Sequence, residues 1–222
     1  MNNVNEDYFI NCQTPESAYI LGFLWGDGHL RKRLTDKNQE WSMSLECIKA
    51  DIDEIKHLFD NSGKWYYFVR TRKNWKPQVT LRACNKALYE YLESQNYHNK
   101  SQVCPIILNN IPKELHHYWW RGYSDADGCI YYHDKQSLTQ HSISSTYEQD
   151  WSVYLSLLDS MNIKYIVQKT ISPKGNKSSK VVISSKLGVI NFCKFIYNGE
   201  QFGLSRKLDK FNLIKNKYPN LI

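Results

Sequence analysis

A short pattern occurs twice in this chain of 222 residues: a mostly apolar run, a glycine and, five positions after that glycine, Asp-Gly. The first copy spans residues 18–28 and the second spans residues 118–128. An apolar run that stops at Asp-Gly is typical of a helix followed by a turn. Because the pattern recurs 100 positions later, we predict two helices that pack together and deliver Asp27 and Asp127 to one shared site.

Each of these helices carries two small residues four positions apart. Gly22 and Gly26 fall on one side of the first helix, and Gly122 and Ala126 take the same places in the second. Small residues at this spacing allow two helix backbones to approach closely. We therefore expect Gly22 and Gly122 to lie in the helix interface.

The segments between and after the two copies follow the same order. The first half predicts a helix that begins at Thr14 and Pro15, because Thr caps helices and Pro is tolerated at the first helical position. After Gly28 the period changes to two, which indicates strands. The remaining elements predicted for this half are strands at 29–33 and 40–48 around a turn at 35–39, a helix from Asp51 to about 63, a hairpin of 64–72 and 77–83, and a helix at 85–95.

The second half repeats this order. It predicts strands after Gly128, a helix headed by Asp150, a hairpin of 164–171 and 180–184, a helix through Val189 and Ile196, and a last helix at 208–217. The fold class expected is therefore α+β, with two pseudo-symmetric α-β-β-α-β-β-α subdomains at 1–109 and 110–222. The antiparallel sheet of each subdomain would be available for binding.

Charge is repeated in the same way. Residues 64–82 contain six basic side chains and no acidic one, and the same holds for residues 164–186. The whole chain carries a formal net charge of +7. A basic surface indicates an anionic partner, nucleic acid first, although a solvated basic face is the alternative.

Several classes of protein are not indicated. No stretch approaches the ~20 apolar residues that a membrane span needs. Residues 1–13 are polar and acidic, unlike a secretory signal or a transit peptide. The six cysteines form no C-x-x-C pair and no zinc-finger spacing, so we expect free thiols in a reducing compartment.

Residues 20–28 and 120–128 resemble the two nine-residue motifs of the LAGLIDADG homing endonucleases. The second copy, with Arg121-Gly122-Tyr123-Ser124-Asp125-Ala126-Asp127-Gly128, is the closer match. The first copy has Trp25 where the family often has Asp. The resemblance covers nearly the whole chain and implies a pseudo-symmetric monomer whose two saddle-shaped sheets straddle double-stranded DNA.

The resemblance also implies roles for individual residues. The last Asp of each motif would hold a divalent metal, Mg²⁺ or Mn²⁺, with help from the preceding backbone carbonyl. Lysines after the last helix of each half would lie near the scissile phosphate, and a polar side chain past the second strand would lie near the attacking water. The positions concerned are Asp27, Asp127, Gly26, Ala126, Lys100, Lys207 and Lys49.

Sequence recognition would come from side chains on alternate strand positions, since an antiparallel ribbon fits the major groove. Arg70, Arg72 and Arg82 suit guanine, and Gln78 suits adenine. Glu40 and Glu46 suit cytosine amines or orient the arginines, and lysines at the hairpin ends suit phosphates. The DNA-binding positions that we predict are Arg31, Arg33, Glu40, Ser42, Ser44, Glu46, Arg70, Arg72, Lys73, Lys76, Gln78, Thr80, Arg82, Gln168, Lys174, Lys177 and Lys180.

These observations predict a site-specific homing endonuclease that makes a metal-dependent double-strand break in a long, nearly asymmetric DNA site. A DNA-binding regulator or an RNA maturase on the same scaffold is the first alternative. A structural or interaction protein with solvated basic faces is the second. The expected location is intracellular, in a bacterial or phage-infected cytoplasm or in an organelle.

Overall fold

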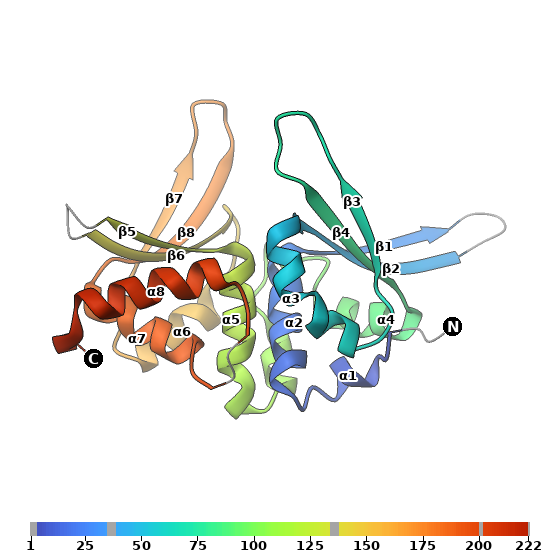
Figure 1. Cartoon of the computed structure of the whole chain (residues 1–222), viewed down its shortest axis with the longest axis horizontal. Helices are drawn as coiled ribbons and strands as arrows, with labels where there is room; N and C mark the ends of the chain where they lie inside the picture. The colour runs from blue at the N-terminus through green and yellow to red at the C-terminus, as the bar shows by residue number, and fades with distance from the viewer. Residues whose placement is uncertain (1–3, 35–38, 134–137, 200–201, 222) are drawn as a thin grey trace. The chain divides into compact units, whose positions relative to one another are not determined.

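The computed structural model describes residues 4–34, 39–133, 138–199 and 202–221. The chain divides into two compact units (Figure 1). Unit 1 comprises Met1–His98 and Ile106–Ala126, and unit 2 comprises Asn99–Pro105 and Asp127–Ile222. None of the helices described is long and apolar enough to cross a membrane.

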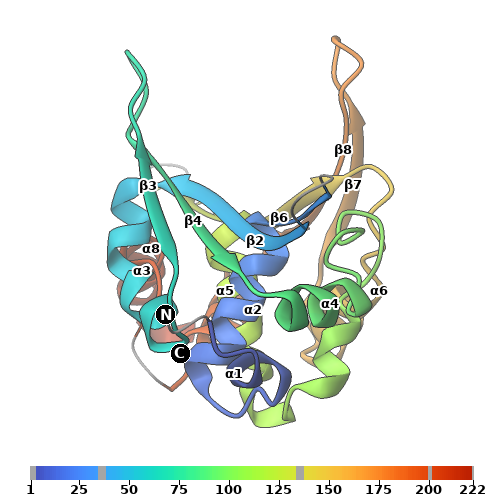
Figure 2. The ribbon, with the colours of Figure 1, turned by 90° about the vertical axis from the view of Figure 1, so that its right-hand side faces the viewer.

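Unit 1 contains a four-stranded antiparallel sheet in the order β1-β2-β4-β3. Helices α2, α3 and α4 pack on one face of this sheet (Figure 2). The opposite face, which we call the outer face, is not covered by these helices. The elements of unit 1 are α1 (Asp7–Ile10), α2 (Pro15–Asp27), β1 (Gly28–Leu34), β2 (Gln39–Ile48), α3 (Lys49–Asn61), β3 (Tyr66–Arg70), β4 (Gln78–Cys84), α4 (Lys86–Ser94), and the 3₁₀ helices η1 (Ile106–Asn110) and η2 (Lys113–Leu115).

Unit 2 has the same topology, with strand order β5-β6-β8-β7. Helix α5 (His116–Asp127) links the two units, since its residues up to Ala126 belong to unit 1 and Asp127 belongs to unit 2. The elements of unit 2 are β5 (Gly128–His133), β6 (Leu138–Thr146), α6 (Ser152–Ser160), β7 (Ile166–Ile171), β8 (Lys177–Ile183), α7 (Lys186–Ile196), α8 (Ser205–Lys217) and the 3₁₀ helix η3 (Pro219–Leu221).

The predicted α+β fold class and the repeated element order are confirmed, and so is the core-facing alternation of β2. The compact units do not follow the repeat boundary at 109/110, because α5 packs in unit 1 and residues 99–105 pack in unit 2. Several elements differ from expectation: α1 and the three 3₁₀ helices were not predicted, and β8 and α8 each begin three residues earlier, at Lys177 and Ser205. The predicted turn at 35–39 falls mostly outside the described residues.

Local chemistry explains both ends of α2. The Thr14 side chain accepts a hydrogen bond from the Ser17 N–H at 3.1 Å, and Ser17 completes a capping box, so the predicted start is confirmed. The helix ends before Gly28 as expected, where the backbone becomes extended. Gly28 has an ordinary φ of −71°, while a Cβ there would lie 2.3 Å from the Leu24 carbonyl oxygen.

Helices α2 and α5 approach each other at their central glycines. A Cβ added to Gly22 would lie 1.9 Å from the Trp119 carbonyl oxygen, and one added to Gly122 would lie 2.0 Å from the Tyr19 carbonyl oxygen. These contacts are reciprocal, because Gly22 and Tyr19 of α2 correspond in the repeat to Gly122 and Trp119 of α5. Gly22 and Gly122 therefore lie where the backbones of α2 and α5 come closest.

We predict that Gly22→Ala and Gly122→Ala each lower the free energy of unfolding by about 2–3 kcal/mol, since the new methyl group meets a backbone carbonyl that cannot rotate away. The matched control is Asn212→Ala, at an exposed position in the middle of α8. It should change stability by less than about 0.5 kcal/mol. Urea denaturation of the three variants measures this, and a Gly22→Ala protein as stable as the control would contradict the close packing.

Candidate active site and nucleic-acid interface

Asp27 is the last residue of α2, and its side chain is half-buried. The Cys47 thiol, on β2 and 8% exposed, donates a hydrogen bond to Asp27 Oδ2 at 2.9 Å. A carboxylate at the C-terminal end of a helix adds negative charge to the negative end of the helix dipole. A cation bound there would therefore be favoured by both the carboxylate and the helix.

Asp127 is the last residue of α5 and is exposed. The next residue, Gly128, accepts a hydrogen bond at its carbonyl oxygen from Lys207 Nζ at 2.8 Å. Lys207 is only 3% exposed and lies in the first turn of α8, where the predicted helix boundary had left it in the preceding loop. The ammonium group of Lys207 therefore lies beside Gly128, the residue that follows Asp127.

The other two predicted lysines have different surroundings. Lys49 begins α3 and forms an ion pair with Asp53, one turn further along the helix. The hydrogen bond to Asp53 raises the pKa of Lys49, so this side chain stays protonated at neutral pH. Lys100 is half-exposed in the segment 99–105, which belongs to unit 2 although the sequence repeat assigns it to the first half.

Asp27 and Asp127 each offer oxygen donors of the kind that a hard divalent cation prefers. Within the part of the chain that the structure describes, no group of three or more His, Cys, Asp or Glu side chains could hold a metal ion. Each motif contributes one carboxylate at a helix end, next to backbone carbonyl oxygens. Oxygen donors of this kind suit Mg²⁺ or Mn²⁺ rather than zinc.

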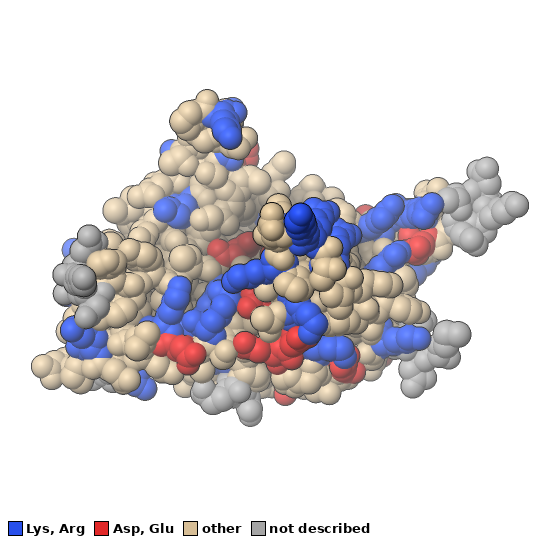
Figure 3. All heavy atoms as spheres, turned by 45° about the horizontal axis from the view of Figure 1, so that its top comes forward, with Lys and Arg blue, Asp and Glu red and all other residues tan. Residues whose placement is uncertain are grey.

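The outer face of the unit 1 sheet gathers ten of the predicted DNA-binding residues. Strand register sets the pairs Arg31–Ser42, Arg33–Glu40, Ser44–Arg82, Glu46–Thr80 and Arg70–Gln78 side by side. Two ion pairs cross this face, between Arg82 and Glu40 and between Arg70 and Glu46. Figure 3 shows Lys and Arg side chains on the side from which the hairpins project, with several carboxylates among them.

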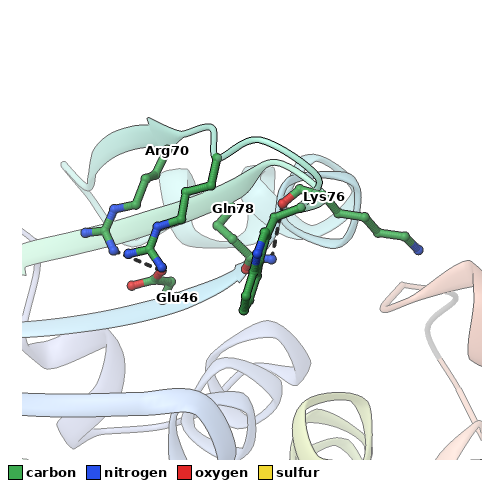
Figure 4. A pocket seen from close by; sticks show the side chains of 6 residues that line it. Glu46, Arg70, Lys76 and Gln78 are labelled. Carbon is green, nitrogen blue, oxygen red and sulfur yellow. Dashed lines mark hydrogen bonds and ion pairs between the residues drawn. The ribbon is translucent and has the colours of Figure 1, made fainter.

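Two hollows open on this face. The first, of about 400 Å³, is lined by Arg31, Ser42, Ser44, Phe68, Arg70, Thr80 and Arg82. The second, of about 330 Å³, is lined by Glu46, Arg70, Arg72, Trp75, Lys76 and Gln78. In Figure 4, Arg70 is directed toward Glu46, and the Gln78 amide lies beside the Lys76 carbonyl group to which it donates at 3.4 Å. Both hollows are open to solvent. The first combines guanidinium and hydroxyl groups, and the second combines guanidinium, ammonium, carboxylate and carboxamide groups.

Solved structures with a similar fold include homing endonucleases in complex with DNA. A structure of I-DmoI in complex with DNA and Mn has 16% sequence identity and a TM-score of 0.57, covering 84% of this chain and 98% of that one. I-SmaMI bound to an uncleaved DNA target in the presence of calcium ions has 14% identity, a TM-score of 0.56 and 94% coverage of each chain. The LAGLIDADG homing endonuclease I-GzeII in complex with its DNA target has 12% identity, a TM-score of 0.55 and coverage of 92% and 91%.

The chain has the LAGLIDADG homing endonuclease fold. No family model matches the sequence, and no curated protein matches it. At 12–16% identity the likeness establishes the fold, so the function has to be argued from the residues of this chain.

The two Asp-Gly motifs of this chain are not equivalent. Asp125 of the second motif is buried and accepts a hydrogen bond from the Tyr19 hydroxyl group at 2.9 Å. Trp25, at the corresponding position of the first motif, is 2% exposed and packs edge-on against Tyr97 with ring centroids 5.0 Å apart. The first motif therefore uses this position for packing, which leaves Asp27 as its only carboxylate.

Sequence reasoning missed the exposed aromatic residues of the LAGLIDADG sheet in unit 1. Phe68 is 53% exposed within the first hollow, and Tyr66 stacks on it with ring planes 15° apart. Trp75 is 65% exposed and lines the second hollow. Side chains alternate between the two faces along β3, so Tyr66 and Phe68 lie on the same face as Arg70. The period of two in the sequence could therefore have predicted their position.

In unit 2 the predicted residues divide between two faces. Gln168 and Lys180 are paired on the face of the unit 2 sheet opposite to the buried Ile143 and Val181, which we call the outer face of unit 2. Lys177 falls on the opposite face by register, with its ammonium group 5.8 Å from the ring centroid of Tyr147, and Lys174 lies in the β7–β8 turn.

Lys207 also influences a buried histidine of unit 2. His141 is fully buried on the inner face of β6, with its ring 4.6 Å from Phe192. Burial, and to a smaller extent the charge of Lys207, lowers the pKa of His141 to about 3. The folded state therefore keeps this ring neutral where the unfolded chain binds a proton, and stability falls as pH decreases from about 6.5 toward 3.

We predict that His141 removes about 2 kcal/mol from the free energy of unfolding between pH 7 and pH 5. His141→Gln should abolish that part of the pH response, whatever it does to stability at pH 7. His57→Gln, at an exposed position, is the matched control and should retain the parent response. Urea denaturation at the two pH values measures the difference, and equal responses in both variants would show that His141 has no such effect.

Proposed function

We propose that this protein is a site-specific homing endonuclease that makes a metal-dependent double-strand break in a long, nearly asymmetric DNA site. The observation that carries the proposal is the pair of glycine-packed motif helices, each ending in Asp-Gly and each followed by a four-stranded antiparallel sheet. A pure packing role would not require a carboxylate at both helix ends.

Asp27 and Asp127 would hold the divalent metal, with the carbonyl groups of Gly26 and Ala126 as further oxygen donors. When bound, Mg²⁺ or Mn²⁺ neutralises phosphate charge and lowers the pKa of a coordinated water. The Cys47 thiol would orient Asp27 through its hydrogen bond to Oδ2. I-DmoI structures solved with Mn and with Ca support a divalent ion in general.

The lysines would act through charge. Lys207, held against the Gly128 carbonyl group beside Asp127, would stabilise negative charge that develops on the phosphate. Lys100 would do the same from the segment 99–105. Lys49 would contribute as a cation rather than as a general base, because Asp53 raises its pKa.

The outer faces of the two sheets would read the DNA. A two-stranded antiparallel ribbon enters the major groove with alternate side chains toward the base edges. The chain would act on double-stranded DNA as a monomer, since one polypeptide contains both motifs and both sheets. We also propose an intracellular location, where such a substrate occurs.

The decisive experiment begins with in vitro selection of a cleaved site from a randomised DNA library with Mg²⁺. On that site we predict that Asp27→Asn and Asp127→Asn each reduce the cleavage rate by roughly 100- to 1,000-fold or more, because metal binding needs the carboxylate charge. DNA affinity in Ca²⁺ should remain within a few-fold of the parent. Asp209→Asn, at an exposed position on α8, is the control and should cleave normally.

Other outcomes would select a different function. Specific binding of duplex DNA without cleavage would favour a regulator, and preference for structured RNA would favour a maturase on the same fold. A DNA-binding protein of this charge should lose affinity steeply as salt increases. Absence of binding even at low salt would exclude both nucleic-acid functions.

A further inference from the structure

The outer faces of the two sheets have the same topology but different chemistry. In unit 1 the outer face carries six formally charged side chains on its strands: Arg31, Arg33, Arg70, Arg82, Glu40 and Glu46. Arg70 and Arg82 are each held by a carboxylate on β2. The guanidinium groups are thus positioned before any ligand arrives.

The outer face of unit 2 is almost uncharged. Among its described strand residues, Lys180 is the one Lys, Arg, Asp or Glu whose register places it on this face. Large apolar side chains take several of the remaining exposed positions, beside the hydroxyl groups of Ser144, Thr146, Thr170 and Ser178. They include Ile166, which is 54% exposed, Tyr131, which is 42% exposed, and Leu138, which is 41% exposed.

Carboxamide groups accompany these apolar side chains. Tyr131 pairs with Gln140, and Gln168 pairs with Lys180. Ile166 lies opposite Val182, two residues before Gln168 on the same face of β7. The outer face of unit 2 therefore combines apolar contact surface with hydroxyl groups and with carboxamide groups that suit adenine.

The major groove separates base pairs by these same properties. Guanine presents two acceptors, N7 and O6, that suit arginine, and cytosine presents an amine that suits a carboxylate. Thymine presents a methyl group that suits an apolar side chain, and adenine suits glutamine. We propose that unit 1 reads a half-site rich in G·C pairs, and that unit 2 reads a half-site rich in A·T pairs through contacts of Ile166 and Tyr131 with thymine methyl groups.

The positive charge around the outer face of unit 2 supports DNA as its ligand. The β7–β8 hairpin and its flanks, residues 164–186, carry six lysines and no carboxylate. Such a surface attracts phosphates. This inference rests on the proposed function, and it adds which base pairs each unit prefers.

The test uses the full chain and a binding selection in Ca²⁺ from a randomised duplex library, so that cleavage is not required. The selected site should contain one half rich in G·C and one half rich in A·T. Replacing thymidine by 2′-deoxyuridine removes the methyl groups, and replacing guanosine by 7-deazaguanosine removes N7. Since one methyl group contributes about a factor of four, deoxyuridine at two or more contacted positions should weaken binding of the A·T-rich half by roughly tenfold or more.

Matched variants on one strand assign the halves to the units. Ile166→Ala should weaken binding and reduce the sensitivity to deoxyuridine, while retaining the sensitivity to 7-deazaguanosine in the other half. Ile171→Ala is the control, because Ile171 is 61% exposed on the same strand but falls on the opposite face by register. Arg82→Ala should show the reverse pattern, with loss of the response to 7-deazaguanosine alone.

The outcomes separate this inference from the proposed function. A defined selected site whose halves do not differ in composition, or whose affinity ignores deoxyuridine, would overturn the inference and leave a sequence-specific DNA-binding protein. Equal effects of Ile166→Ala and Ile171→Ala would also overturn it. Failure to select any DNA site would overturn both the inference and the proposed function.

Discussion

The backbone contact between α2 and α5 is the constraint on which the rest of unit 1 depends. At Gly22 and Gly122 each helix lies against a carbonyl oxygen of the other, closer than any side chain would permit. This approach buries the Tyr19–Asp125 hydrogen bond and brings Trp25 against Trp119, with ring centroids 6.0 Å apart. It also leaves the last turn of α2 in a fixed place above the sheet, so that Asp27 meets the thiol of Cys47 on β2.

Both units use the same scaffold for different purposes at their outer faces. The inner faces carry most of the buried strand residues, such as Met43 and Leu45 in unit 1 and Ile143 and Val181 in unit 2, so their chemistry is set mainly by packing. The outer faces have no such requirement, and there the two units diverge into paired arginines and glutamates in one and apolar and carboxamide side chains in the other. A scaffold held together by its helices is free to vary its exposed strand positions without loss of stability.

The fold was largely predictable from the sequence because its signals are local or periodic. Thr14, Pro15 and Ser17 begin α2 through contacts within one turn, and the apolar alternation of β2 places its inner residues. The sequence could not place α5 or the segment 99–105 in a unit. The unit in which a segment packs depends on its contacts with residues far away in the sequence. No pattern within the segment itself predicts these contacts.

For the candidate site, the sequence by itself determined the two Asp-Gly helix ends, the glycines that allow close packing, and the basic hairpins. Only the tertiary structure decided that Asp53 holds Lys49, that Lys207 is buried against Gly128, and that Tyr66 and Phe68 stand among the arginines. The physical reason is the distance along the chain over which each interaction acts. Helix caps and strand alternation act over a few residues, whereas the partner of a lysine and the neighbours of an exposed ring are set by register and packing between segments far apart in the chain.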